Sequence, residues 1–115
     1  MATDYPQISV TLDREDKEAL EQINSLLERS GIAPLLLSGL HLYSWANMEP
    51  GLLSVTLEDW NQLSKAIRGS NATMLQVIHR IIARQMLRHD MKGNRDQYLF
   101  WANYESVVVK EIKGI

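Results

Sequence analysis

The chain has 115 residues, of which 45% are hydrophobic, and its formal net charge is -2 at pH 7. This length is enough for one compact core and too short for two independent ones, so residues 1–115 are expected to form a single domain. Because cysteine is absent, disulfides and thiolate metal sites are excluded. The first residues lack the basic-then-apolar pattern of a secretory signal, and no apolar run approaches the ~18 residues of a membrane span. These features are typical of a cytoplasmic protein that does not enter a membrane.

The small net charge hides a strong asymmetry along the chain. Residues 1–60 hold three basic and ten acidic residues, whereas residues 61–95 hold seven basic residues and one acidic residue. Separate acidic and basic surfaces can each attract a partner, or they can attract each other. The overall pI of about 5.9 therefore says little about what the protein binds.

The first part of the chain predicts a strand followed by two helices. Residues 8–12 (ISVTL) alternate between apolar and small polar side chains, which indicates a short half-buried strand. Asp13 is a suitable N-cap for a helix whose apolar face spans residues 19–27 and which ends at Gly31. In residues 34–46, a proline suited to a first helical turn precedes apolar side chains that cover nearly the whole circumference of a second helix.

The same order of elements then begins again. Residues 53–58 (LSVTLE) repeat residues 8–13 with an offset of 45, and a short helix and a long amphipathic helix over 71–92 follow. We interpret this as an internal repeat, with units at 7–47 and 52–92, whose two strands pair within one chain. The fold class expected is therefore mainly α with two short β-strands.

A last element is expected over residues 95–113. Tyr98, Leu99, Trp101 and Ala102 recur at roughly helical spacing, which favours a C-terminal helix. The β-branched run 107–109 leaves a strand open as the alternative.

Four basic residues follow one flank of the long helix at intervals of four. These are Arg80, Arg84, Arg88 and Lys92. Three interpretations remain open for them: a solvated face that pairs with the acidic half of the chain, contact with nucleic acid, or contact with an acidic protein.

Nothing in the sequence predicts a reaction. His41, His79 and His89 have no partner at a metal-ligand spacing, and adjacent His89 and Asp90 would point apart on a helix. A glycine-rich phosphate loop, a nucleophile elbow and paired cysteines are all absent from the sequence. We therefore expect no catalytic residues, no metal and no cofactor.

The succession of alternating strand, helix, glycine-containing turn and apolar helix resembles the ribbon-helix-helix family of small DNA-binding regulators. The resemblance covers residues 7–92 and implies tandem units in one chain, with an antiparallel ribbon that enters the major groove. It implies that Ser9, Thr11, Ser54 and Thr56 occupy the base-reading face. It also implies that the amino ends of the later helices, near Ala33 and Asn71, lie where phosphate binds.

The leading hypothesis is a small DNA-binding transcriptional regulator that uses these residues together with the basic helix. The alternative is a protein-binding modulator of the kind that phages and plasmids encode, such as an inhibitor, an antirepressor or an anti-defence protein. It would act through the acidic half of the chain or through the basic helix. A structural subunit is a third class, and self-association as a homodimer is left open.

Overall fold

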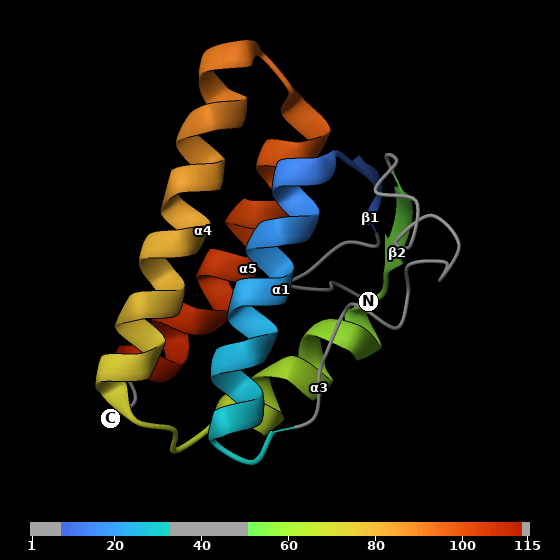
Figure 1. The fold of residues 1–115 in the computed structure, drawn as a ribbon. Coiled ribbons are helices and arrows are strands. Elements are labelled where there is room, and N and C mark those ends of the chain that lie inside the picture. The colour runs from blue at the N-terminus through green and yellow to red at the C-terminus, as the bar shows by residue number, and fades with distance from the viewer. Residues whose placement is uncertain (1–7, 33–50, 114–115) are drawn as a thin grey trace.

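The computed structural model describes residues 8–32 and 51–113, and this part of the chain is mainly helical with two short strands (Figure 1). The elements are β1 (Ile8–Leu12), α1 (Arg14–Arg29), β2 (Gly51–Val55), α3 (Leu57–Ile67), α4 (Ala72–Lys92) and α5 (Arg95–Lys113). The expectation of a mainly α fold with two short strands is confirmed. The helix predicted over residues 34–46 lies outside the described residues.

The two strands form an antiparallel ribbon within one chain, as the sequence repeat predicts. Ile8 is opposite Val55, and Leu12 is opposite Gly51. Val10, Leu12 and Val55 are buried, whereas Thr11 is exposed. One face of the ribbon therefore contributes to the core, because alternate residues of a strand point to opposite faces.

Each strand leads directly into a helix that begins with a capping box. In α1 the N-cap Asp13 exchanges two hydrogen bonds with Asp16, and in α3 the N-cap Thr56 exchanges two with Asp59. Such caps satisfy backbone N–H groups that have no partner inside the helix, and each contributes about 1 kcal/mol.

These caps also correct the register of the predicted repeat. The strands begin at residues 8 and 51, the caps lie at 13 and 56, and the helices begin at 14 and 57. The two strand-and-cap segments are thus 43 residues apart, rather than the 45 that the matching residues indicate. The internal repeat as a whole stays a prediction, because the second helix of its first unit lies outside the described residues. Thr56 caps a helix and does not continue the strand, because its hydroxyl group satisfies the start of α3.

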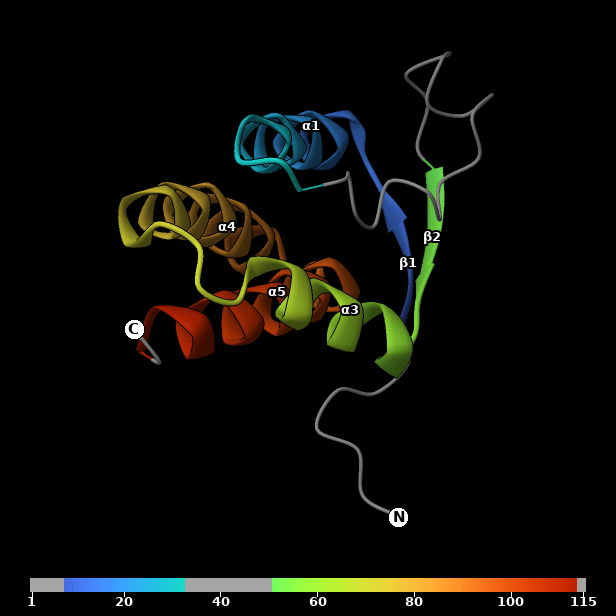
Figure 2. The same ribbon diagram turned by 90° about the horizontal axis from the view of Figure 1, so that it is seen from below.

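The helices form two layers beside the ribbon (Figures 1 and 2). α4 and α5 make a helical hairpin whose turn contains Gly93 at φ 73°, a left-handed conformation that glycine adopts without strain. α1 packs on α4, α3 packs on α5, and β1 packs on α5 and α1. The core lies where these faces meet, and its largest buried side chains include Trp60, Trp101, Tyr104 and Phe100.

The C-terminal segment is a helix, as predicted, although it contains the run Val107–Val109. Its buried residues recur at intervals of three and four and are Phe100, Trp101, Tyr104, Val107, Val108 and Glu111. This spacing makes one helical face, so packing against α3 and α4 overrides the β-propensity of the valines.

Candidate functional site

The residues expected to read DNA bases do not share one environment. Thr11 is exposed on β1, and its backbone oxygen accepts a hydrogen bond of 2.9 Å from Gln97 Nε2. Ser9 pairs with Ser54 in the ribbon, and their side chains lie outside what the structure describes. Thr56 is half-buried, and its hydroxyl group caps α3.

Asn71 also has a local role at a helix start. Its Oδ1 atom accepts hydrogen bonds from the backbone N–H groups of Thr73 and Met74, at 2.8 and 3.2 Å. Asn71 is therefore the N-cap of α4, and this use of its side chain requires no ligand.

The four basic residues of α4 divide into two kinds. Arg80, Arg84 and Lys92 are exposed and have no ion-pair partner among the described residues. The side chain of Arg88 is only 14% exposed and is turned toward α1. The interpretation of pairing with the acidic half thus applies to Arg88.

The Arg88 guanidinium contacts three carboxylates of the α1 start. It donates to both oxygens of Asp13, at 2.8 and 3.0 Å, and to Asp16 Oδ1 at 2.9 Å. Its Nε atom lies 2.8 Å from Glu15 Oε2 and 2.9 Å from Gln85 Oε1. This paired arrangement with Asp13 is the geometry in which a guanidinium binds a carboxylate most strongly.

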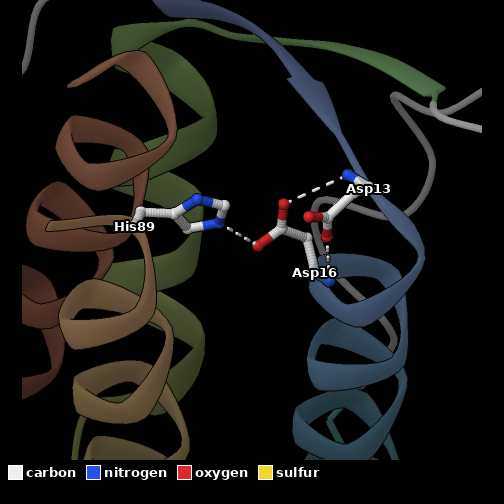
Figure 3. Close-up of side chains that lie close together, drawn as sticks. All are labelled: Asp13, Asp16 and His89. Atoms are coloured by element: carbon white, nitrogen blue, oxygen red, sulfur yellow. Dashed lines mark hydrogen bonds and ion pairs between the residues drawn. The ribbon is translucent and has the colours of Figure 1, made fainter. Parts of the chain in front are cut away.

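Asp16 lies at the centre of these contacts and is fully buried. Its Oδ1 atom also lies 2.7 Å from His89 Nε2 and accepts a hydrogen bond of 2.9 Å from Trp101 Nε1. Figure 3 shows His89 pointing from α4 toward Asp16, with Asp13 on the far side of that carboxylate. We call this group the Asp16 cluster, and its members are Asp13, Asp16, Arg88, His89 and Trp101.

Burial and pairing shift the pKa values in the cluster in different directions. Burial raises the pKa of Asp16, because the loss of water outweighs the hydrogen bonds from His89 and Trp101. For Asp13, burial acts in the same direction and is the largest single influence, but the hydrogen bonds from Arg88 and Asp16 and the charge of Arg88 together outweigh it and hold the pKa well below its usual range. The pKa of Arg88 is raised, since its carboxylate partners overcome its partial burial.

Asp13, Asp16 and His89 bring three potential metal-ligand atoms within 4.8 Å of one another. The donor set does not fit a metal ion, because the Arg88 guanidinium already lies against both carboxylates as their counter-cation. A divalent cation there would have to displace a paired arginine from a buried position. The cluster is best understood as an ion-pair network that joins α1, α4 and α5.

No local sequence pattern indicates this network. The partner of His89 is Asp16, which is 73 residues away, and not the adjacent Asp90. The polar side chains of α1 and α4 pair only because the tertiary fold places the two helices side by side.

A second feature is the solvent-facing side of α4. We call it the outer stripe, and its residues are Val77, Arg80, Arg84, Leu87 and Met91. Leu87 is 60% exposed and Met91 is 79% exposed, one turn apart on the same helix. They are the most exposed large hydrophobic residues in the described part of the chain.

A groove of about 480 Å³ lies beside this stripe, between α1 and α4. Its lining comprises Glu15, Glu18, Ala19 and Gln22 of α1 and Arg80, Ile81, Arg84 and Gln85 of α4. Arg80 and Arg84 thus belong both to the outer stripe and to the edge of the α1–α4 groove. The acidic and basic surfaces predicted from the sequence meet here.

Comparisons of the chain with protein-family models, curated proteins and solved structures give no match. Within residues 8–32 and 51–113, no helix has both the length and the apolar character that crossing a membrane requires.

Proposed function

We propose that this protein is a protein-binding modulator and that the outer stripe of α4 is its binding surface. The observation that carries the proposal is the exposure of Leu87 and Met91, one turn apart, beside two arginines that have no ion-pair partner in the described structure. Exposed neighbouring apolar side chains on a well-packed helix favour contact with another protein.

The residue types of the stripe suit such a contact. Arginine and methionine are enriched at protein interfaces, and the flexible methionine side chain adapts to differently shaped partners. The helix itself is held on two sides, by α1 through the Asp16 cluster and by α5 through packing. A surface that is ordered before binding loses less conformational entropy when the partner arrives.

The charge distribution supports protein binding over binding to a long polyanion. Arg88 is committed to Asp13, Glu15 and Asp16, which removes one of the four cations of α4. Exposed leucine and methionine side chains also gain nothing from phosphate groups.

The test is quantitative capture of cellular proteins on the immobilised chain. The double variant Leu87→Asp/Met91→Asp should lose a captured protein that both the wild type and Leu99→Asp retain. Leu99 is a matched control because it is also an exposed leucine, 40% exposed, on a different helix. Equal capture by all three proteins would contradict the assignment of the outer stripe.

DNA binding through the ribbon is the second candidate, and one observation favours it. β1 and β2 pair within one chain, with one face on the core and Thr11 exposed, as the resemblance to ribbon-helix-helix regulators implies. Titration of mixed duplex DNA between about 50 and 200 mM salt tests it, since several phosphate contacts produce a steep loss of affinity. A steep loss that is unchanged in Leu87→Asp/Met91→Asp would favour this candidate.

A further inference from the structure

We infer that the partner segment is an acidic amphipathic helix, with its carboxylates on Arg80 and Arg84 and its apolar side chains on Leu87 and Met91. This inference rests on the proposed protein-binding function and specifies the chemistry of the partner. It follows from the charges of the α1–α4 groove, from the order of residues along α4 and from the surfaces available elsewhere on the molecule.

The acidic and basic residues that line the groove differ in whether they already have an ion-pair partner. Glu15 lies 2.8 Å from Arg88, and Glu18 lies 3.2 Å from Arg14. Each acidic residue of the lining thus has a basic partner, whereas Arg80 and Arg84 have none in residues 8–32 and 51–113. The uncompensated charge at the groove is positive, and carboxylates of a partner would neutralise it.

The less exposed residues of the groove lining are Ala19, Ile81 and Gln85. Ala19 is buried and Ile81 is half-buried, and both line the groove between the charged residues. A volume of about 480 Å³ accommodates a few side chains and not a whole helix. A partner helix would therefore lie over the groove and direct acidic side chains into it, with their methylene groups against Ala19 and Ile81.

The order of residues along α4 divides the surface into two halves. Arg80 and Arg84 are four residues apart, and so are Leu87 and Met91. From residue 80 to residue 91 a helix extends about 16 Å, or about three turns. A partner helix laid along this length would carry carboxylates at an interval of four in one half and apolar side chains at an interval of four in the other.

A second copy of this chain fits the surface less well. The exposed side of α1 carries Glu18, Glu21 and Glu28, which would complement the arginines. However, the exposed large hydrophobic residues of the described chain are Val77, Leu87, Met91 and Leu99, and none of them belongs to α1. Docking α1 of a second copy would leave Leu87 and Met91 without apolar partners.

The experiment is selection of a displayed library of helix-forming peptides, about 18 residues long, on the full-length protein. We expect enrichment of peptides with acidic residues at an interval of four in one half and leucine, isoleucine, methionine or phenylalanine at an interval of four in the other. Their affinity should fall at least about tenfold in Arg80→Gln/Arg84→Gln and should be unchanged in Arg95→Gln, an exposed arginine on α5. The circular dichroism spectrum and thermal melt of each variant would verify that the fold is intact.

Three results would overturn the inference: no enrichment, enrichment of neutral or basic peptides, or binding that does not depend on the two arginines. A concentration-dependent dimer that Arg84→Glu dissociates in sedimentation would identify a second copy as the occupant instead. If a captured protein depends on Leu87 and Met91 and not on the arginines, the partner chemistry is wrong and the proposed function stands. If binding depends neither on Leu87 and Met91 nor on Arg80 and Arg84, both the proposed function and the inferred partner chemistry are wrong.

Discussion

The Nε2 atom of His89 lies 2.7 Å from Oδ1 of Asp16, although the two residues are 73 positions apart in the sequence. Neither side chain is more than 1% exposed. Asp16 is also part of the capping box that begins α1, so the same carboxylate helps to start one helix and joins it to another. This relationship places α1 against α4, and the groove beside the outer stripe depends on that placement.

The first prediction concerns the Asp16 carboxylate. The side chains of Arg88, His89 and Trp101 all contact the Oδ1 atom of Asp16. Asp16→Ala removes this shared acceptor from a buried position. We expect a loss of about 3–5 kcal/mol in the free energy of unfolding, measured by urea denaturation. Glu18→Ala, which removes an exposed pair with Arg14, should change it by only about 0–1 kcal/mol. Similar small losses in both variants would show that the cluster contributes little.

The second prediction concerns pH. The folded-state pKa of Asp13 is lowered from its ordinary value of 3.8, so its contribution to stability is present above that value and is lost as the pH falls below it. Asp16 acts in the opposite sense, because its raised pKa lets the folded state take up a proton more readily than the unfolded state. Asp13→Asn preserves the N-cap and removes the first effect, while the second persists because burial is the largest cause of the raised Asp16 pKa.

The measurement is the urea midpoint between pH 6 and about pH 3, where carboxyl groups titrate. The midpoint of the wild type should fall more steeply toward acid than that of Asp13→Asn. Parallel profiles for the two proteins would mean that Arg88 does not stabilise the charged form of Asp13.

Some of this architecture is accessible from the sequence, and the reason is physical. Strand alternation at residues 8–12 and helical spacing in α1, α4 and α5 are local patterns, and each of these elements is present where expected. Pairing of the two strands followed from their similar sequences and is observed. The matching residues predict a second strand that begins at residue 53, whereas β2 begins at Gly51. The difference arises because the hydroxyl group of Thr56 can either lie on a strand or cap a helix, and the residue type alone does not distinguish the two.

The candidate site was less accessible. Arg80, Arg84 and Arg88 follow one another at identical spacing, and only the position of α1 separates the buried arginine from the exposed ones. In the sequence, Leu87 and Met91 look like ordinary residues of the apolar face of an amphipathic helix. The width of that face does not determine how much of it the core buries. Which side of α4 remains exposed depends on tertiary contacts that no local pattern encodes.

The third prediction concerns Tyr104, whose hydroxyl group is buried without a hydrogen-bond partner in the described structure. Burial raises the pKa of this hydroxyl, because the charged form would be still more costly there. Tyr104→Phe removes an unsatisfied polar group and retains the ring contacts with Trp60 and Trp101. We expect unchanged or higher thermal stability. A loss above about 1 kcal/mol would indicate that the hydroxyl group has a partner after all.

The fourth prediction contrasts two apolar residues of α4. Ile78 is 1% exposed and belongs to the core, so Ile78→Ala should lower the free energy of unfolding by about 2–5 kcal/mol. Leu87 is 60% exposed, and Leu87→Ala should change stability by no more than about 0.5 kcal/mol. If the two variants lose comparable free energy of unfolding in denaturant melts, Leu87 contributes to packing of the core and is not a free binding surface.

The fifth prediction concerns the different roles of the arginines of α4, of which Arg88 stabilises the fold and Arg80 and Arg84 bind the partner. Arg88→Gln disrupts the ion pairs with Asp13, Glu15 and Asp16 and should lower the stability of the fold. Arg80→Gln/Arg84→Gln touches no ion pair of the described structure and should leave stability unchanged. The two variants therefore separate folding from binding on the same helix.

The most direct measurement is isothermal titration of the wild type and these two variants with an acidic helical peptide selected on the wild type, alongside their urea melts. We expect that Arg80→Gln/Arg84→Gln weakens peptide binding at least about tenfold and leaves stability unchanged. We expect that Arg88→Gln, under conditions in which it is folded, binds the peptide with an affinity closer to that of the wild type. Full peptide affinity in Arg80→Gln/Arg84→Gln, with loss of affinity only in Arg88→Gln, would contradict these expectations.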